Sequence, residues 1–258
     1  MASAKMFDLT GKVAVVTGGN GGIGRGIALG LAEAGASVAI LARNEERNRS
    51  TLEELQKLGP PAMALKLDVS QRKLLKPALD EVEGNLGPID ILVNNAAFAI
   101  LKSLLDHSEE DWDSVLETDL TSCFLLSKYA AASMVPRRAG KIINVASVGA
   151  YKGTPIYPSY GVSKGGLLQL TRCLAIELAP HNIQINSLAP GWTTTDMTDW
   201  IRNDPKYAAV KDEMLTRTPA GRFAEPSEMA GAAVFLASHA SDFVTGADII
   251  VDGGFFIR

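Results

Sequence analysis

Seven short apolar runs alternate with helical patterns along the chain. The runs are continuous rather than alternating in polarity, which is typical of parallel strands whose two faces are both covered. Strands that alternate with helices are joined by right-handed crossovers into a doubly wound sheet. In chain order the runs are KVAVVTG, SVAILA, AMALKLDV, IDILVNNA, GKIINVAS, IQINSLAP and ADIIVDGG. The sequence therefore predicts an α/β fold with a seven-stranded parallel sheet and helices on both faces.

One segment interrupts this alternation. Residues 191–217 are too long and too rich in turn residues for a simple connection, and such segments are usually lids or binding loops. The alternative is a surface excursion. Since α/β folds often run to about 250 residues as one unit, we expect residues 1–258 to form one domain with an insertion at about 191–217. Helices are expected near 70–86, 111–136, 157–180 and 226–238.

The overall composition excludes several classes of protein. The chain is 47% hydrophobic, with a net charge of −4 and no Lys/Arg-rich run, which argues against nucleic acid as a partner. No apolar run reaches the roughly 18 residues of a membrane-spanning helix, and the first residues lack the pattern of a signal peptide. We therefore expect a cytoplasmic protein with no membrane partner.

Cysteines and histidines show neither a disulfide nor a metal pattern. Cys123 and Cys173 lie in apolar stretches without CxxC spacing, so we expect both to be reduced core residues. His107, His181 and His239 are scattered along the chain, and we interpret them as surface or structural residues. The sequence predicts no metal site.

The stretch TGGNGGIG follows the first predicted strand and opens the first helix. A bare glycine pattern is often only a tight turn, but between a strand and a helix it predicts the phosphate cradle of a Rossmann fold. Gly18 permits the turn, Gly22 lets the backbone approach a pyrophosphate, and Gly24 lets helix and strand pack closely. The helix N-terminus adds unpaired N–H groups and partial positive charge. We expect these glycines, with Asn20 and Ile23, to bind a dinucleotide.

The end of the second predicted strand indicates which dinucleotide is bound. An acidic residue here would accept hydrogen bonds from the ribose 2′-hydroxyl and favour NAD(H). The sequence ILARNEER instead has Ala42 at that position, followed by Arg43, whose guanidinium can pair with a 2′-phosphate. We therefore favour NADP(H) over NAD(H). The alternative is that Arg43 is an ordinary solvated charge, paired with Glu45 or Glu46.

Tyr160 and Lys164 are four residues apart in YGVSK, so they share one helix face. Hydride transfer between a carbinol and a nicotinamide also moves a proton at the substrate oxygen. A free tyrosine has a pKa of about 10, too high for a good base at neutral pH. A nearby ammonium favours the phenolate, and an oxidised nicotinamide adds a second positive charge. The pair therefore predicts a general acid–base tyrosine beside the cofactor.

The neighbouring Tyr157 lacks this arrangement, because Gly161 occupies the position four residues further on. Pro158 follows Tyr157 and suits the first turn of a helix. We expect Tyr157 at the mouth of that helix, where it either lines the substrate pocket or serves in packing.

Ser147 ends the run GKIINVAS, thirteen residues before Tyr160. Ligands bind at the carboxyl ends of the strands in such sheets. We therefore expect the Ser147 hydroxyl to hold the substrate oxygen and polarise the carbonyl. The alternative is a helix-capping or turn serine.

These motifs follow the order and spacing of a known family. The chain also has LDV ending at Val69, NNAA beginning at Asn94 and PGWTTT beginning at Pro190. It thus resembles the short-chain dehydrogenase/reductase family along almost its whole length. Its C-terminal part, RTPAGRFAEPSEMAGAAVFLASHASDFVTGADIIVDGGFFIR, is similar to the gluconate and sugar dehydrogenases and the 3-oxoacyl reductases of that family.

The resemblance implies further cofactor contacts. It implies that the Asp68 side chain and the Val69 backbone contact the adenine, although Asp68 could merely cap the next helix. It also implies that Asn94 supports the fourth strand beside the cofactor, and that groups around Thr193 hold the nicotinamide carboxamide, although Thr193 could be a solvated loop residue. The cofactor-binding positions implied by the resemblance are Asp68, Val69, Asn95, Ala96, Pro190, Gly191, Thr193 and Thr195.

One position departs from the family pattern. Where the family usually has asparagine, in WDSVLETDLTSCFLLSK, this chain has Asp119. The family's residue helps hold a water that links the lysine to solvent, so the resemblance places Asp119 with Ser147, Tyr160 and Lys164 in the catalytic group. A buried carboxylate is costly unless it is paired or protonated. We hypothesise that Asp119 keeps this relay but shifts its pH dependence. The alternative is a structural aspartate bonded only to local backbone.

The favoured interpretation is an oxidoreductase that transfers a hydride between NADP(H) and a small carbonyl or alcohol substrate. A sugar, a polyol, a gluconate-like acid and a 3-oxoacyl compound all fit that class. We expect Ser147, Tyr157, Tyr160 and Trp192 at the substrate. Two alternatives are a related lyase or epimerase that uses the same tyrosine, and a non-catalytic protein that senses dinucleotides.

The helical segments near 111–136 and 157–180 carry more apolar residues than a half-exposed helix needs. Such a surplus suggests contact between subunits. The family usually assembles through these helices and the C-terminal end. We therefore expect a homotetramer, or failing that a homodimer.

Overall fold

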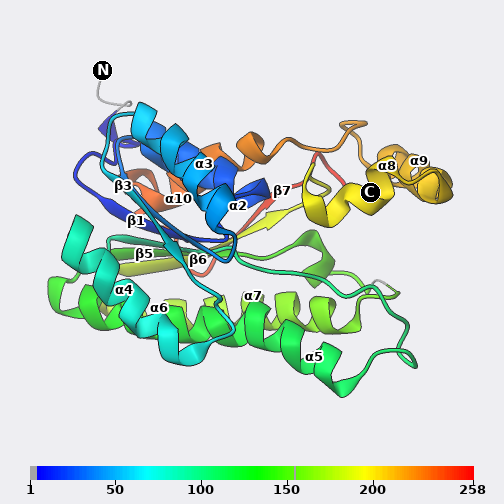
Figure 1. The fold of residues 1–258 in the computed structure, drawn as a ribbon, viewed down its shortest axis with the longest axis horizontal. Coiled ribbons are helices and arrows are strands. Elements are labelled where there is room, and N and C mark those ends of the chain that lie inside the picture. The colour runs from blue at the N-terminus through cyan, green and yellow to red at the C-terminus, as the bar shows by residue number, and fades with distance from the viewer. Residues whose placement is uncertain (1–4, 154) are drawn as a thin grey trace.

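The computed structural model describes residues 5–153 and 155–258. In these ranges seven parallel strands form one sheet, in the order β3-β2-β1-β4-β5-β6-β7, as the sequence predicts. Strands β1, β2 and β3 form one half of the sheet. Strand β4 pairs with the other side of β1, and β5, β6 and β7 extend the second half (Figure 1). The strands are β1 (Val13–Thr17), β2 (Ser37–Ala42), β3 (Ala62–Lys66), β4 (Ile91–Asn94), β5 (Gly140–Val145), β6 (Ile183–Pro190) and β7 (Asp248–Val251).

Helices cover both faces of this sheet (Figure 1). One layer contains α2, α3 and α10, and the other contains α4, α6 and α7, with α5 beside α7. The helices are α2 (Gly22–Glu33), α3 (Glu45–Lys57), α4 (Arg72–Leu86), α5 (Glu109–Leu116), α6 (Ser122–Arg137), α7 (Pro158–Leu178), α8 (Asp199–Asn203), α9 (Ala208–Arg217) and α10 (Ala230–Ala237).

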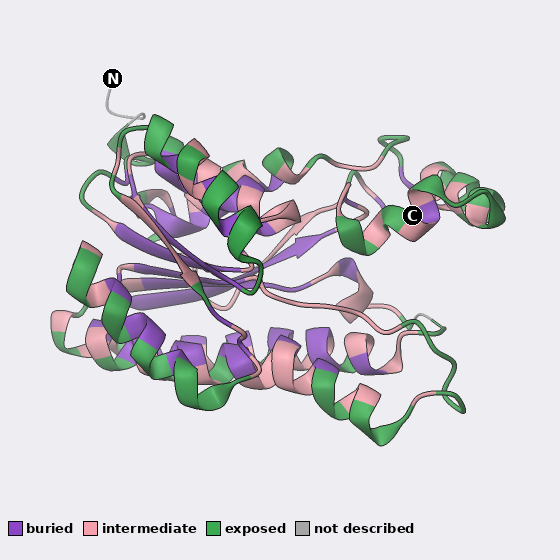
Figure 2. Cartoon of the chain, viewed as in Figure 1, coloured by how far each residue is buried: buried purple, intermediate pink, exposed green. Residues whose placement is uncertain are grey.

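Strand β1 shows why the apolar runs are continuous. Val13 and Val15 belong to a buried cluster that includes Leu79 of α4. Ala14 and Val16 point to the opposite face and belong to a second cluster, with residues of α2 and α10. Both faces of the strand are therefore removed from water, as the buried sheet in Figure 2 shows. A strand buried on two sides needs apolar residues at every position.

Two segments differ from the predicted helices. The helix expected near 111–136 consists of α5, a π-helical turn at Glu117–Thr121, and α6. The helix expected near 226–238 begins with a 3₁₀ turn at Pro226–Met229 before α10. A π turn adds a single residue to the helix, which shifts the apolar period too little for a sequence pattern to reveal it.

The insertion at about 191–217 follows the carboxyl end of β6. It contains α8 and α9 together with 3₁₀ turns. These helices project away from the two main layers (Figure 1).

The two cysteines have different environments. Cys123 is buried in α6, whereas Cys173 is exposed on α7, and both thiols are free. The prediction that both are core residues is therefore wrong for Cys173. The reason is that the outer face of α7 is itself apolar, with Ile176 79% exposed, so an apolar neighbourhood in sequence does not indicate burial here.

The contact between α2 and the 3₁₀ turn before α10 leads to a stability prediction. A Cβ added at Gly26 would lie 2.3 Å from the carbonyl oxygen of Pro226, which is backbone and cannot move aside easily. Overpacking of this kind typically costs about 1–3 kcal/mol, more than the roughly 1 kcal/mol that alanine gains over glycine in a helix. We expect Gly26→Ala to lower the free energy of unfolding in a denaturant titration. Gly231→Ala is the control, because its added Cβ meets nothing within 4 Å. Equal stability of the two variants would contradict the prediction.

Candidate active site

The carboxyl ends of β1 and β4 meet where the strand order reverses, which is where α/β sheets bind ligands. The Thr17 hydroxyl accepts hydrogen bonds from the backbone N–H groups of Asn95 (2.9 Å) and Ala96 (3.0 Å). The Asn95 side-chain amide in turn donates to the carbonyl of Thr17 at 2.8 Å. Two strands from distant parts of the sequence are thereby fixed at one point.

The glycine-rich loop packs directly onto this junction. Gly18 has a φ of 63°, and a Cβ added at Gly24 would lie 2.3 Å from the carbonyl oxygen of Gly18. Helix α2 begins at Gly22, with no side-chain cap and no acidic residue in its first turn. Its first N–H groups therefore remain open to an anion. The conformation of the loop fits the pyrophosphate of a dinucleotide.

Side chains of α3 hold the other side of the loop. The Asn20 amide donates hydrogen bonds to the Asn48 side chain (2.7 Å) and to the Asn44 carbonyl (3.1 Å). Arg47 of α3 forms an ion pair with Asp196 of the insertion. Sequence reasoning missed this bridge, because its two residues are 149 positions apart and neither stands out in its local pattern.

Arg43 lies near the end of β2, where its side chain is 73% exposed. One guanidinium nitrogen is 4.0 Å from a carboxylate oxygen of Asp68. Neither acidic neighbour proposed from the sequence pairs with Arg43 among the described ion pairs, and Glu45 contacts Lys66 instead. The Asp68 carboxylate also accepts two hydrogen bonds from Ser70, at its N–H and its hydroxyl. Arg43 and Asp68 thus lie side by side at the ends of β2 and β3.

The first two turns of α7 carry Tyr160 and Lys164. Lys164 is 2% exposed, and its ammonium donates a hydrogen bond to the Val145 carbonyl at 3.0 Å, at the end of β5. The same ammonium lies 5.6 Å from the centre of the Tyr160 ring. The spacing of four residues therefore places the cation beside the phenol.

Ser147 follows β5 on the same side of the sheet. Its hydroxyl accepts a hydrogen bond from the Gly149 N–H at 3.0 Å, so it caps the short 3₁₀ turn that starts at Val148. The hydroxyl proton is not used in that bond and stays free for another acceptor. The capping role and a role at the substrate are therefore compatible.

Two opposing effects act on the Tyr160 phenol. Burial raises its pKa, while the Lys164 ammonium and the Ser147 hydroxyl act to lower it, and the net direction is upward from the ordinary value. The expectation that Lys164 lowers the pKa of Tyr160 thus describes the smaller of two effects. Without a bound cofactor, burial raises this pKa by more than the lysine lowers it. Tyr157, at the start of α7, has its ring 6.2 Å from that of Tyr160. Burial raises the pKa of Tyr157 to about 12.

Asp119 is the fourth residue that the structure brings to this point. It lies fully buried in the π turn between α5 and α6. Its Oδ1 accepts a hydrogen bond from the Phe98 N–H at 3.1 Å, and its Oδ2 is 3.8 Å from the Lys164 ammonium. Burial raises the pKa of Asp119 to about 6, with Lys164 acting in the opposite direction. The one hydrogen bond of its side chain among the described residues is to backbone, as the structural alternative expects, but Phe98 lies 21 residues away in sequence and Lys164 lies within ion-pair distance.

A buried polar network lies behind the reactive groups. The Asn94 amide donates to the side chains of Asn144 (2.8 Å) and Ser127 (3.0 Å). The Asn144 amide donates in turn to the Thr171 hydroxyl of α7 at 2.9 Å. These bonds tie the ends of β4 and β5 to α6 and α7.

The end of β6 leads into the threonine-rich segment. β6 ends at Pro190, and a Cβ added at Gly191 would lie 2.6 Å from Asp252 Cβ. Thr193 is buried rather than solvated, and its hydroxyl donates to the Gly191 carbonyl at 3.1 Å. The methyl group of Thr195 lies 3.1 Å from the position of a Cβ on Gly22. This segment therefore faces the glycine-rich loop.

Trp192 has a different environment from these threonines. Its ring packs edge-on against Phe223 and Phe255, with ring centres 6.0 and 6.4 Å apart. Its indole N–H is buried and has no hydrogen-bond partner within the described residues. The structure thus places Trp192 in an aromatic cluster under the insertion.

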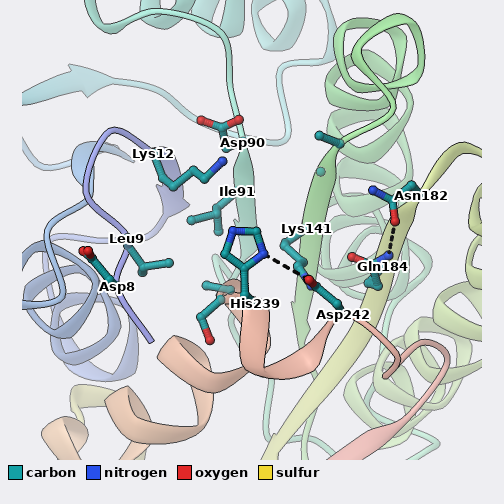
Figure 3. A pocket seen from close by; sticks show the side chains of 14 residues that line it. Asp8, Leu9, Lys12, Asp90, Ile91, Lys141, Asn182, Gln184, His239 and Asp242 are labelled. Atoms are coloured by element: carbon teal, nitrogen blue, oxygen red, sulfur yellow. Dashed lines mark hydrogen bonds and ion pairs between the residues drawn. The ribbon is translucent and has the colours of Figure 1, made fainter. Parts of the chain in front are cut away.

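A separate cavity of about 90 Å³ lies at the opposite edge of the sheet (Figure 3). Its walls come from residues at or before the amino ends of β1, β4, β5 and β6 and from the segment that follows α10. Several of its charged and polar side chains bond to one another, including His239 with Asp242 and Lys141 with Asp242. This cavity contains none of the residues described above, so the candidate active site lies at the carboxyl edge.

Comparisons with known proteins identify the family of the chain. A family model described as enoyl-(acyl carrier protein) reductase, from the short-chain dehydrogenases, matches residues 18–256. The chain belongs to the short-chain dehydrogenase/reductase family. It is an NAD(P)-dependent oxidoreductase of that family, and its cofactor is a nicotinamide dinucleotide.

Several similar proteins are named for activity on sugar acids. The chain is 43% identical over 253 residues to 2-dehydro-3-deoxy-D-gluconate 5-dehydrogenase of Escherichia coli strain K12, covering 98% of each chain. It is 39% identical over 252 residues to 5-keto-D-gluconate 5-reductase of the same strain, again covering 98% of each. A crystal structure of gluconate 5-dehydrogenase from Burkholderia cenocepacia J2315, in complex with NADP and tartrate, matches with a TM-score of 0.93. That chain is 37% identical, and the match covers 99% of both chains.

Within the described residues, no helix has the length and apolar character needed to cross a membrane. In the same part of the chain, no group of His, Cys, Asp and Glu side chains is arranged to hold a metal ion.

Proposed function

We propose that this enzyme transfers a hydride between NADP(H) and a ketone or secondary alcohol of a gluconate-like sugar acid. The observation that carries the proposal is the placement of Tyr160 beside the buried ammonium of Lys164, at the carboxyl edge of the sheet near Ser147. The sugar-acid class is supported by the names of several relatives, which are gluconate-type dehydrogenases or reductases. We interpret residues 1–258 as one dinucleotide-binding domain, with the insertion as its substrate loop.

The residues of the glycine-rich loop would hold the dinucleotide. The uncapped start of α2 suits the pyrophosphate, and the segment from Pro190 to Thr195 suits the nicotinamide end. When bound, the reduced cofactor supplies the hydride. Asp68, Val69, Asn95 and Ala96 lie at the ends of β3 and β4, where we assign contacts with the nucleoside parts.

The protein residues handle the proton. In the direction of reduction, the Tyr160 hydroxyl donates its proton to the carbonyl oxygen, which becomes the alcohol. Ser147 donates a hydrogen bond to that oxygen and polarises the carbonyl. Lys164 stabilises the phenolate that remains. Tyr157 and Trp192 are the side chains we assign to the pocket wall.

We propose that the enzyme works in the cytoplasm as a homotetramer. The free thiols of Cys123 and Cys173 suit a reducing compartment. Exposed apolar side chains occur in two parts of the chain: on α6 and α7, with Phe124, Val162 and Ile176, and in the C-terminal part, with Phe243 and Ile257. Two independent self-complementary contacts give a closed tetramer.

The activity test uses a panel of substrates with NADPH. We expect 5-keto-D-gluconate to be reduced faster than a neutral ketose or an acetoacetyl thioester. Tyr160→Phe is expected to lower kcat/KM by about 10²–10⁴-fold, because it removes the general acid. Tyr157→Phe is the matched control and is expected to keep most of the activity. NADPH binding, followed by fluorescence, is expected to persist in both variants. Full turnover by Tyr160→Phe would refute the mechanism.

The cofactor preference depends on Arg43. We expect Arg43→Ala to raise the KM for NADPH by about ten- to hundredfold, because a charge-assisted hydrogen bond is worth about 1.5–3 kcal/mol. The KM for NADH should change little, since NADH has no 2′-phosphate. Arg49→Ala removes another exposed arginine near the same strand end and serves as the control. An intrinsic preference for NADH in the unmodified enzyme would show that the assignment is wrong.

The assembly is tested by sedimentation. We expect one species of four times the chain mass, and we expect Ile176→Glu to break the contact through α7 and leave a dimer. Lys57→Glu, a change of charge on the exposed surface of α3 in the other helix layer, is the control for a general effect of acidic substitution. A single species of monomer mass for the unmodified protein would exclude the tetramer.

A further inference from the structure

We propose that Asp119 is a positioning residue: its carboxylate neutralises Lys164 and thereby keeps the Tyr160 phenol protonated to a higher pH than an amide at this position would. The inference rests on the proposed function, because it concerns the same tyrosine. It goes beyond that function because it assigns the carboxylate an effect on the ionisation of Tyr160, at a position where the family pattern described above has an amide.

The contacts of Asp119 direct its charge at Lys164. Its Oδ1 is fixed by the Phe98 N–H. Its Oδ2 is buried and has no hydrogen-bond partner within the described residues, and it lies 3.8 Å from the Lys164 ammonium. Both side chains are almost completely buried, at 0% and 3% exposure. At this distance and without solvent screening, each charge acts strongly on the other.

The surroundings contain few other charges. From α7, Tyr160 and Lys164 face the carboxylate. From α6, the Cys123 thiol donates to the Asp119 carbonyl at 3.4 Å, and burial raises the pKa of this thiol to about 11, so it is neutral. The loop after β4 contributes the Phe98 N–H. The charge of the site is therefore decided by Asp119, Lys164 and Tyr160 together.

The net charge determines how readily the phenol ionises. With Asp119 and Lys164 both ionised, the pair is neutral, and a phenolate would make the site negative. With an amide at position 119, the lysine charge would stand alone and a phenolate would make the site neutral. A site that is positive before ionisation favours the phenolate more than a neutral one does. Asp119 accordingly acts to raise the pKa of both Tyr160 and Lys164.

The backbone gives the carboxylate this position. Asp119 is the central residue of the π turn at Glu117–Thr121, which packs against α7. π turns inside α-helices occur frequently at functional sites. Because the turn lies between α5 and α6, it is held on both sides by regular helix.

Asp119→Asn is the decisive variant, because it removes the charge and preserves the shape. We expect the pH profile of kcat/KM for alcohol oxidation, which requires the phenolate, to move toward acid, with a several-fold gain at neutral pH. For ketone reduction, which requires the protonated phenol, kcat/KM falls at high pH. This decline should move toward acid by the same amount. Asp119→Ser, smaller but also uncharged, should move the profile in the same direction even if its kcat is lower. Asp113→Asn, on the exposed face of α5, is the control and should leave the profile in place.

A second measurement needs no turnover. The pKa of Asp119 is raised from 3.8 to about 6 in the folded protein, so its contribution to stability is present below about pH 4 and is lost as the pH rises through 6. The unmodified protein should therefore lose stability relative to Asp119→Asn over this interval, as measured by thermal unfolding without cofactor.

The outcomes separate this inference from the proposed function. A pH profile that does not move in Asp119→Asn, while Tyr160→Phe is inactive, overturns the role of Asp119 and leaves the function standing. If the unmodified protein turns over no sugar acid, the proposed function fails and the thermal measurement alone decides whether Asp119 carries its charge at neutral pH. A stability difference that keeps growing above pH 7 would mean that Asp119 is still protonated there, and it would overturn the neutralisation of Lys164.

Discussion

The Thr17 hydroxyl joins the ends of β1 and β4, and the geometry of the site depends on that junction. Three groups meet there: the Thr17 hydroxyl, the Asn95 amide and the backbone of the glycine-rich loop. A Cβ at Gly24 would lie 2.4 Å from the Asn95 amide nitrogen as well as against Gly18. The glycine is therefore required by the protein's own packing, before any ligand is considered. The start of α2 beside this junction has no side-chain cap, because its N-cap residue is Gly21.

The sequence predicts this fold well because burial on two faces leaves a strong signal. β1 and β2 read as continuous apolar runs and are buried at nearly every position. The signal fades where burial is partial, as in the edge strand β3, or where an apolar surface is exposed, as around Cys173. It is absent for contacts between distant segments. The Arg47–Asp196 bridge from α3 to the insertion depends on where two surface loops meet, and no local pattern encodes that.

The positions of the candidate site residues were predictable to the extent that helical periodicity fixes them. The spacing of Tyr160 and Lys164 places both on one face of α7, and the structure has them there. The pKa of the tyrosine could not be predicted in the same way, because it depends on burial by neighbouring elements as well as on the lysine. Ser147 illustrates a similar limit. Its hydroxyl both caps a 3₁₀ turn and faces the reactive edge, and the sequence presented these as alternatives.

The carboxylate at position 119 is tolerated because the Lys164 ammonium, 3.8 Å away, is its counter-ion. Among the described residues it is the one fully buried acidic side chain, and its partner, Lys164, is equally withdrawn from water. A neutral pair of this kind does little by itself to acidify Tyr160. An oxidised nicotinamide bound beside it would bring the missing positive charge. Release of the tyrosine proton would then follow cofactor binding more closely than with an amide at position 119, because the carboxylate already balances the lysine charge.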